Sequence, residues 1–272
     1  MCIRDSRGFD VTIYAMAIPP NVTSNMSLAG FTPASGLVEN DRRTPEWDAQ
    51  YRRAADIAYR QLQLLCGPHF GVSWLDNYSL VDELREPQQG TPERPNLNAG
   101  LTVGREVFGP GEHPFATKYA IRSPQIRIEP SIYLDCLMRD FTLFGGRIIV
   151  RKFDTPRELA ALREPIVVNC TGLGARDLFG DQELIPLKGQ LTVLVPQEEV
   201  NYHTNGGVPT DGLPPGSLGI HMLARRDGII LGGTSQRGVW TLEPDEAERR
   251  RVVESHIAVF SAMRSPLLQK RA

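Results

Sequence analysis

The amino-acid sequence predicts an α/β fold in which a domain of alternating helices and strands is interleaved with a domain built on an antiparallel sheet. Helices and short apolar strands alternate from residue 131 to 169, which is typical of a sheet covered by helices. A hairpin is predicted where two apolar strands flank Arg225-Arg226-Asp227-Gly228. The chain has 272 residues, of which 41% are hydrophobic, so it can bury an ordinary core.

Four helices are predicted from the signals at their ends. Thr44 can cap a helix that begins at Pro45, because a threonine hydroxyl accepts a backbone N–H and proline suits the first helical position. Gly145 ends a second helix, and Thr155 with Glu158 forms a capping box that begins a third. The predicted helices are Pro45–Leu65, Ser131–Phe144, Arg157–Leu162 and Pro244–Met263.

Two of these helices carry apolar residues at helical spacing, and we expect both stripes to face the core. The stripes consist of Trp47, Tyr51, Ala54, Ala58 and Leu65 in the first helix and Val253, Ile257 and Phe260 in the last.

The strands are predicted from short apolar and β-branched runs. The segment from residue 67 to 122 is rich in proline, glycine and glutamine, so only short strands are expected there. Elsewhere the predicted strands are Val11–Ala15, Arg147–Phe153, Ile166–Asn169, Gly189–Val195, Ile220–Leu223 and Ile229–Leu231.

Composition excludes several classes of partner. Thirty basic residues stand against 32 acidic ones, and no basic run is long enough to follow a phosphate backbone, so we expect no nucleic-acid partner. We see neither a signal peptide nor a long apolar span, so we expect no membrane and a cytoplasmic location. The four cysteines lack metal-ligand spacing, so no metal site is predicted. Four histidines are predicted at the surface or in loops, namely His69, His113, His203 and His256.

Four segments, in this order, carry a resemblance to a known family. They are Val11–Gly30, Gly145–Gly174 with its run Val167-Val168-Asn169-Cys170-Thr171-Gly172, Pro186–Gln190, and Asp227–Thr234 followed by Gly238-Val239-Trp240. Together they resemble the D-amino-acid oxidase family of FAD-dependent oxidoreductases. The resemblance implies an FAD-binding Rossmann-like domain, here incomplete, interleaved with an antiparallel-sheet substrate domain. The FAD-binding domain is expected over residues 7–36 and 121–185, and the substrate-binding domain over 37–120 and 186–264.

Thr171-Gly172 is a candidate cofactor site on physical grounds as well. An apolar strand that ends in a small polar residue and glycine lets backbone amides approach a ligand at the carboxyl edge of a parallel sheet. The alternative is an ordinary strand-to-helix turn that needs glycine for its dihedral angles.

The resemblance implies two further contacts with FAD. Thr23, Ser24 and Asn25 would form a loop of hydroxyl and amide groups against the cofactor; the alternative is a polar turn after two prolines. Phe153 would lie on the adenine side, or else it is a core aromatic. We expect Thr171-Gly172 and the Thr23–Asn25 loop to surround one cleft.

His221 is the candidate residue of the substrate pocket, at a hairpin position where the family usually has tyrosine. It could donate to the substrate carboxylate or shape the pocket; the alternative is a histidine on the solvent side of a hairpin. If His221 faces solvent while Ile220 and Met222 face inward, the alternation of a strand favours the alternative.

The resemblance implies oxidation of a D-amino acid to an imino acid, then a keto acid and ammonia, with oxygen reduced to hydrogen peroxide. The implied partners are a small amino acid substrate and oxygen, and the family is compatible with a homodimer. Two alternatives stay open: a related FAD oxidase of an amine, glycine or D-aspartate, and a non-catalytic remnant.

Two parts of the family pattern are missing from the sequence. No GxGxxG turn precedes Val11, and the arginine that binds the substrate carboxylate is expected outside this chain. The start, Met1–Ser6, has no targeting, helical or strand pattern, and the sequence stops just after a predicted helix. We therefore expect a chain truncated at both ends and inactive as it stands.

Overall fold

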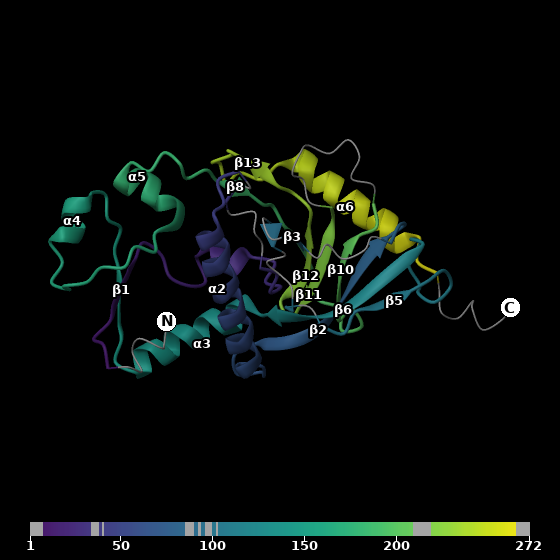
Figure 1. The fold of residues 1–272 in the computed structure, drawn as a ribbon, viewed down its shortest axis with the longest axis horizontal. Helices are drawn as coiled ribbons and strands as arrows, with labels where there is room; N and C mark the ends of the chain where they lie inside the picture. Colours follow the sequence, from purple (N-terminus) through teal and green to yellow (C-terminus); the bar gives the residue numbers. More distant parts are fainter. Residues whose placement is uncertain are drawn as a thin grey trace. The chain divides into compact units, whose positions relative to one another are not determined.

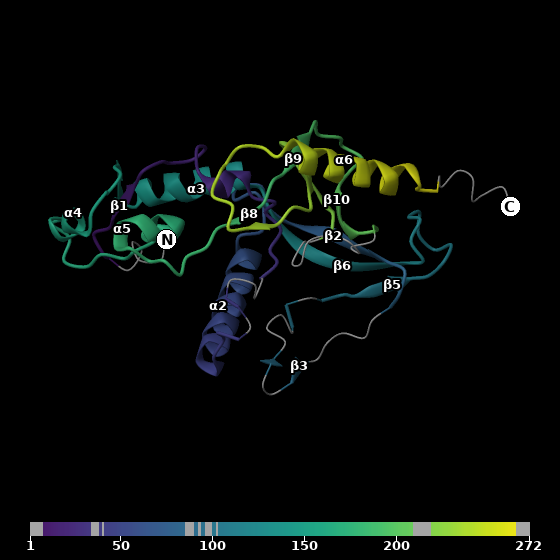
Figure 2. The ribbon, with the colours of Figure 1, turned by 90° about the horizontal axis from the view of Figure 1, so that it is seen from above.

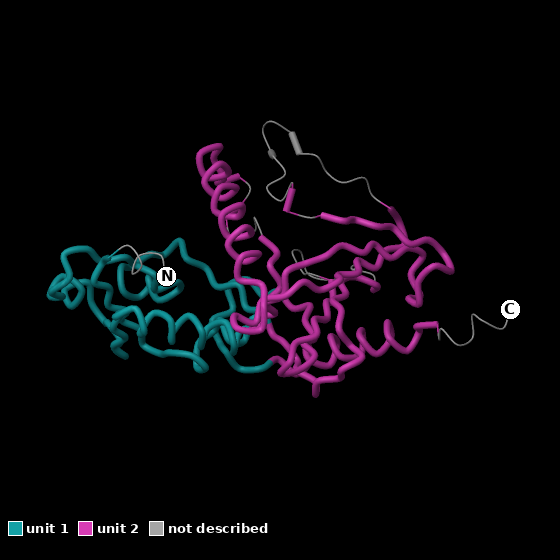
Figure 3. The backbone as a smooth tube through the Cα atoms, turned by 90° about the horizontal axis from the view of Figure 1, so that it is seen from below, with its two compact units in different colours: residues 1–27, 130–189, 235–244 teal, residues 28–129, 190–234, 245–272 magenta. Residues whose placement is uncertain are grey.

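A computed structural model of the chain describes residues 8–33, 38–39, 41–84, 90–91, 94–95, 100–101, 103–208 and 219–264. The expected leader at Met1–Ser6 lies outside these residues. The chain divides into two compact units (Figure 3), the first made of residues 1–27, 130–189 and 235–244 and the second of 28–129, 190–234 and 245–272. The boundaries expected at residues 36, 120 and 185 therefore differ from breaks at 27, 129 and 189, and the functions of the units stay predictions.

Unit 1 contains a two-stranded parallel sheet beside a long helix. Strand β1 (Thr12–Ala15) pairs with β7 (Arg147–Val150), so that Thr12 lies opposite Arg147. The other elements of unit 1 are η1 (Thr23–Met26), α3 (Pro130–Leu143), α4 (Pro156–Ala160), η3 (Gly172–Gly174), α5 (Ala175–Phe179), β8 (Leu187–Lys188) and β13 (Gln236–Arg237) (Figure 1). The capping box of α4 is confirmed, since the Glu158 carboxylate accepts the backbone N–H of Thr155 at 3.0 Å.

The turn between α3 and β7 follows the glycine signal. Gly145 has a φ of +92°, a left-handed conformation that favours glycine. Gly146 lies against the fully buried ring of Phe141, and any side chain at Gly146 would overlap that ring. The two glycines thus end the helix and let the chain turn closely over its own last aromatic residue.

The prediction of a strand at Ile166–Asn169 is wrong. These residues belong to no sheet in the described part of the chain, and Ile166, Val167 and Val168 are 78%, 49% and 50% exposed. The apolar run is suited to a strand, but a strand forms only beside a neighbour that supplies hydrogen bonds, and only β1 and β7 pair in this sheet.

Unit 2 is built on a seven-stranded sheet with the order β5-β6-β2-β10-β11-β12-β9 (Figures 1 and 2). Neighbours are antiparallel except β2 and β10, which are parallel. The strands are β2 (Val72–Val81), β5 (Glu106–Phe108), β6 (Tyr119–Ile128), β9 (Thr192–Leu194), β10 (Tyr202–Gly206), β11 (His221–Arg225) and β12 (Gly228–Gly232), and a separate pair joins β3 (Gly90–Thr91) to β4 (Arg94–Pro95). The predicted hairpin of β11 and β12 is confirmed, with Arg225 opposite Gly228.

The expectation of only short strands between residues 67 and 122 is wrong. Strands β2 and β6 each have ten residues and pair along their whole length. Polar residues interrupt both strands, and Pro124, which has no backbone N–H, lies inside β6 opposite Asp76. Because of these residues, neither strand shows the continuous apolar pattern from which a long strand is predicted.

Helix α2 (Pro45–Leu64) begins as predicted, since the Thr44 hydroxyl accepts the backbone N–H of Trp47 at 3.2 Å. Its buried residues are Asp48, Ala55 and Leu62, whereas Ala54 is exposed. The expected stripe was therefore wrong at Ala54, and its other four residues are half-buried. Asp48, which the stripe did not include, is buried, and Arg43 pairs with it at 2.8 Å.

Helix α6 (Glu246–Ser261) is capped by the carboxylate of Asp245 and lies on the sheet of unit 2 (Figure 2). The helix buries Val252, His256 and Val259, while Ile257 is 59% exposed. The predicted stripe of Val253, Ile257 and Phe260 thus does not coincide with the buried face of the helix. The prediction missed that face because His256, which lies at its centre, was expected at the surface. Val252 packs in one core cluster with Met222, Ile229 and Leu231, and Val259 in another with Leu80, Phe115, Ala120 and Ile220.

Within the described residues, no helix combines the length and the apolar character needed to cross a bilayer.

Candidate functional site

The parallel pair of unit 1 brings two candidate segments to one edge. Because β1 and β7 run in the same direction, their carboxyl ends meet at the same edge of the sheet. The Thr23–Asn25 loop follows β1, and Phe153 follows β7. This edge is the place where a nucleotide cofactor is expected in such a sheet.

The Thr23–Asn25 loop forms the 3₁₀ turn η1, packed near α3. Thr23 and Ser24 are exposed, while Asn25 is buried. The side-chain oxygen of Asn25 is buried without a hydrogen-bond partner among the described groups. A buried polar atom without a partner is costly, so this acceptor is suited to a ligand or an ordered water.

Phe153 lies between an aromatic ring and a cation. Its ring meets that of Tyr14 edge-on, with centroids 5.6 Å apart, and the Arg151 guanidinium lies 4.6 Å from the ring centre. Arg151 also pairs with Glu158 at 3.3 Å. These contacts suit a partly buried structural aromatic, and they also place a positive charge beside the candidate residue, so both interpretations of Phe153 stay open.

Thr171 and Gly172 form a tight polar turn. The Asn169 side-chain oxygen accepts the Thr171 backbone N–H at 3.0 Å and its hydroxyl at 2.7 Å. Gly172 has a φ of +56°, a left-handed backbone conformation that favours glycine. No atom lies within 4 Å of the position that a Cβ atom would take there, so the backbone conformation, and not steric crowding, favours glycine at this position. Because Ile166–Asn169 is not in the sheet, the sheet does not place this turn, and a shared cleft with Thr23–Asn25 stays a prediction.

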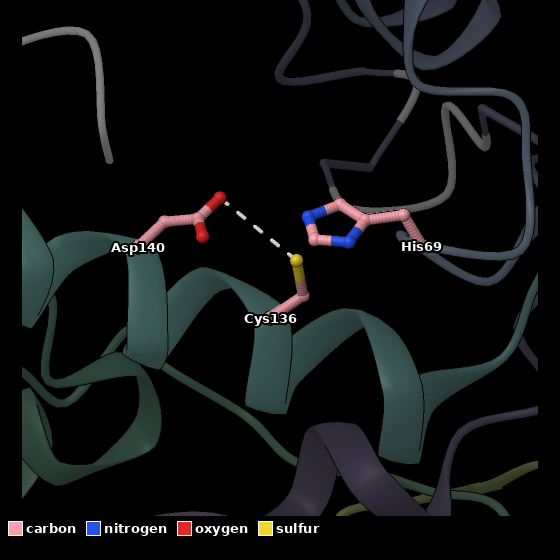
Figure 4. A group of neighbouring side chains, drawn as sticks. All are labelled: His69, Cys136 and Asp140. Atoms are coloured by element: carbon pink, nitrogen blue, oxygen red, sulfur yellow. Dashed lines mark hydrogen bonds between the residues drawn. The ribbon is translucent and has the colours of Figure 1, made fainter.

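Helix α3 carries a buried thiol one turn before a carboxylate (Figure 4). The Cys136 sulfur lies 3.8 Å from the Asp140 carboxylate, and the Arg139 guanidinium donates to the sulfur at 3.3 Å. Burial raises the pKa of the Cys136 thiol, and the charge of Asp140 adds to this effect. The raised pKa makes the Cys136 thiol a poor nucleophile.

His221 lies in unit 2, at the start of β11. It is opposite Gly232 in β12 and Asn205 in β10, and its ring lies against Gly232, where a side chain would overlap it. Burial lowers the pKa of His221, and the nearby His256 lowers it further. His221 is thus a half-buried imidazole, and it lies on the opposite face of β11 from Ile220 and Met222, which are buried in the core clusters that include Val259 and Val252 of α6. Both interpretations of His221 therefore stay open.

Three of the histidines predicted at the surface are buried: His113, His203 and His256 are 5%, 5% and 3% exposed. His256 in α6 contacts two carbonyl oxygens, that of Val252 at 2.7 Å and that of His221 at 3.2 Å. The contacts of His203 with Gln125 and of His256 with the His221 carbonyl join distant segments of the chain, which local sequence patterns do not show. The signal available for His203 was the alternation of the strand it shares with Asn205.

Several polar side chains lie on one face of the sheet, which we call the polar face: His203, His221, Asn205, Asn77 and Gln125. In register, directly opposite residues share a face, as do residues two apart in a strand. The Asn205 amide donates to the Asn77 oxygen at 2.8 Å, and His203 Nδ1 lies 2.6 Å from Gln125 Oε1. Burial lowers the pKa of His203 to about 4, and His221 contributes.

The fold is similar to those of a solved oxidase and a solved dehydrogenase. Glycine oxidase from Geobacillus kaustophilus is similar with a TM-score of 0.62 at 14% identity, covering 94% of this chain and 72% of that one. L-Proline dehydrogenase from P. horikoshii gives a TM-score of 0.61 at 14% identity, with 95% and 72% covered. At this identity the likeness concerns the fold alone.

A sequence model of the family DAO, FAD dependent oxidoreductase, matches residues 4–271, and the chain belongs to this family. It is 26% identical over 263 residues to a D-amino acid oxidase of Dugesia ryukyuensis, covering 94% of this chain and 71% of that protein. It is 26% identical over 253 residues to a D-amino-acid oxidase of Dictyostelium discoideum, with 92% and 65% covered. It is also 31% identical over 128 residues to human D-aspartate oxidase, with 47% and 34% covered.

Membership makes FAD the cofactor of this chain and oxidoreduction its reaction class. The residues of unit 1 fit such a group, because Asn25 keeps a buried acceptor that has no partner among the described residues. The resemblance inferred from the sequence, and the interleaved α/β fold with an antiparallel sheet, are confirmed.

Proposed function

We propose that the chain is part of an enzyme that oxidises the bond between the α-carbon and the nitrogen of a D-amino acid. The α-carbon gives up a hydride, and the amino acid becomes an imino acid, which water converts to a keto acid and ammonia. The chemistry that FAD supplies is the acceptance of these two electrons and their delivery to oxygen, which yields hydrogen peroxide.

The observation that carries this proposal is the match to proteins named D-amino-acid oxidase over 92% to 98% of the chain. The polar face supports it. Because the cofactor takes the hydride, the protein needs mainly to hold and orient the substrate, which neutral hydrogen-bonding groups can do.

Each candidate residue has a part in the proposal. Unit 1 would hold FAD through the side chains of Thr23, Ser24 and Asn25, through backbone amides at Thr171-Gly172 and, on the adenine side, through Phe153. Unit 2 would bind the substrate, with His221 donating a hydrogen bond to its carboxylate.

The test is the reduction of flavin by amino acids. The 272-residue chain, with FAD in excess, is mixed without oxygen with D-alanine or L-alanine, and the flavin absorbance is followed; oxygen is then admitted and peroxide measured. Because the chain is expected to bind FAD weakly and to be inactive as isolated, activity is sought only with FAD in large excess. Under that condition we expect slow bleaching and slow peroxide release with the D-isomer only, and a further loss of about tenfold or more in kcat/KM for His221→Phe, since one hydrogen bond to a charged group is removed. Equal rates with both isomers, or none with either, would reject the proposal.

A D-aspartate oxidase is the second candidate, because the human enzyme of that name is 31% identical over 128 residues. The same assay separates the two: D-aspartate would then be oxidised faster than D-alanine and D-asparagine.

A further inference from the structure

His203 and Gln125 meet on the same face of the sheet as His221. His203 lies two residues before Asn205, which is opposite His221, so the two histidines project from one face. Gln125 comes from β6, two strands away from β10, and its side chain reaches over β2 to His203, with 2.6 Å between Gln125 Oε1 and His203 Nδ1. The strand register thus brings three polar side chains from β6, β10 and β11 together.

Each member of this pair has a polar atom without a partner. His203 Nε2 and Gln125 Nε2 are both buried, and neither has a hydrogen-bond partner among the described groups. Leaving two such atoms unpaired costs free energy that a ligand group would recover. The Gln125 amide packs closely against Gly30. A side chain at position 30 would come within 2.8 Å of Gln125 Nε2, so the position of the amide depends on glycine there.

The pair offers one donor and one acceptor to a ligand. If His203 Nδ1 donates to the Gln125 oxygen, then His203 Nε2 is an acceptor and the Gln125 amide a donor. If the Gln125 amide is flipped and His203 carries its proton on Nε2 instead, then His203 Nε2 is the donor and the Gln125 oxygen the acceptor. The pair still offers one donor and one acceptor. A hydroxyl or carboxamide group can satisfy both, whereas a carboxylate only accepts and an aliphatic group does neither.

The charge of the site agrees with a neutral ligand group. His203 is uncharged near neutral pH, because burial and then His221 lower its pKa to about 4. His203 therefore supplies no positive charge to compensate a carboxylate brought to this pair, and Arg127, two residues along β6 from Gln125, already pairs with Glu129 at 3.2 Å.

We propose that His203 and Gln125 are specificity-determining residues, which bind a neutral hydrogen-bonding group, a carboxamide or a hydroxyl, in the side chain of the substrate. This inference rests on the proposed function. It deepens that function because it selects among D-amino acids those with a polar, uncharged side chain.

The experiment uses D-asparagine, D-aspartate and D-leucine, which have nearly the same shape and differ at the group that would meet the pair. Binding to the 272-residue chain, with FAD in excess, is followed by the ¹⁵N signals of labelled histidine rings, the His203 signal being identified by its loss in His203→Leu. Oxidation of the three amino acids is measured in parallel. The variants are His203→Leu, Gln125→Met and, as a control for loss of a buried imidazole elsewhere in unit 2, His113→Leu.

We expect D-asparagine to shift the His203 ring signals and D-leucine to leave them unchanged. The ratio of kcat/KM for D-asparagine over D-leucine should be about tenfold or more, because D-leucine leaves the pair unpaired. His203→Leu and Gln125→Met should each reduce that ratio toward one, and His113→Leu should keep it.

Three results would overturn the inference: no change at His203 with D-asparagine, equal use of D-asparagine and D-leucine, or preference for D-aspartate. A shift at His203 with D-asparagine in a chain that oxidises no amino acid would support the inference and reject the proposed function. The two failures are therefore distinguishable.

Discussion

Burial of an uncharged imidazole at His203 ties the stability of the fold to pH. The folded pKa is about 4, whereas the ordinary value is 6.5, so the unfolded chain binds the proton first as pH falls. The contribution of His203 to stability is therefore fully present above pH 6.5 and is lost as pH falls toward 4. The complete shift corresponds to about 3 kcal/mol. Burial lowers the pKa of His221 and His256 in the same direction.

This pH dependence can be measured by urea unfolding at pH 7.5 and 4.5. Wild type should lose free energy of unfolding between the two, and His203→Leu should lose about 2 kcal/mol less, since its side chain takes up no proton. Carboxylates present in both chains change the free energy of unfolding equally between the two pH values, so their contribution cancels in the difference between wild type and variant. An equal loss in both would mean that His203 is solvated in the folded chain.

Single residues were predictable from sequence where their partners are local. The capping groups Thr44 and Glu158 contact residues three positions away, and both were found. The burial of His203 depends on Gln125, 78 positions away, and on a strand register that sequence does not show. The alternation of the strand around His203 indicates which residues share its face, but nothing near His203 in the sequence identifies Gln125 as its partner.

At the scale of elements, Gly146 determines how α3 is joined to β7. The methyl group of Gly146→Ala would overlap the buried ring of Phe141, which cannot move without disturbing the core of unit 1. We expect a loss of about 1 to 3 kcal/mol in the free energy of unfolding, the usual cost of overpacking. Urea unfolding followed by circular dichroism measures it.

The matched control for this prediction is Gly174→Ala in the same unit. The nearest atom there is 3.7 Å from the added methyl, an ordinary contact, and Gly174 is not in a left-handed conformation. Gly174→Ala should unfold at nearly the wild-type urea concentration. If the two variants behaved alike, the close approach of Gly146 to Phe141 would not matter to stability.

Elements with signals at their own ends were predicted well, and elements defined by their neighbours were not. Helices α2, α3 and α4 and the β11–β12 hairpin have caps or turns in the sequence. Strands β2 and β6 have mixed polar and apolar residues and a proline, yet they form because each satisfies the backbone of the other over ten residues. The apolar run at Ile166–Asn169 is the opposite case, since its side chains suit a strand but no strand in the described part of the chain pairs with it.

At the scale of the molecule, the two units differ in how completely their sheets are built. Unit 2 has a seven-stranded sheet with two core clusters, while the parallel sheet of unit 1 has two strands in the described residues. Apolar side chains of unit 1 are exposed, including Val150 of β7 at 61% and Val167 at 49%. The candidate contacts with FAD all lie in the less complete unit.

The last prediction is that the 272-residue chain binds FAD weakly and tends to aggregate. The sequence has no GxGxxG turn, so the helix N-terminus that would hold the pyrophosphate in this family is not available from that motif. Losing a charged hydrogen-bonding contact in a buried site typically costs a few kcal/mol, on the order of a hundredfold in affinity. The exposed apolar residues beside a two-stranded sheet add a surface on which copies can associate. Gel filtration after mixing with FAD would give protein with little flavin absorbance, and titration should saturate only with FAD in large excess. A monodisperse yellow protein with stoichiometric flavin would contradict this expectation and would mean that Thr23–Asn25 and Thr171-Gly172 suffice to hold the cofactor.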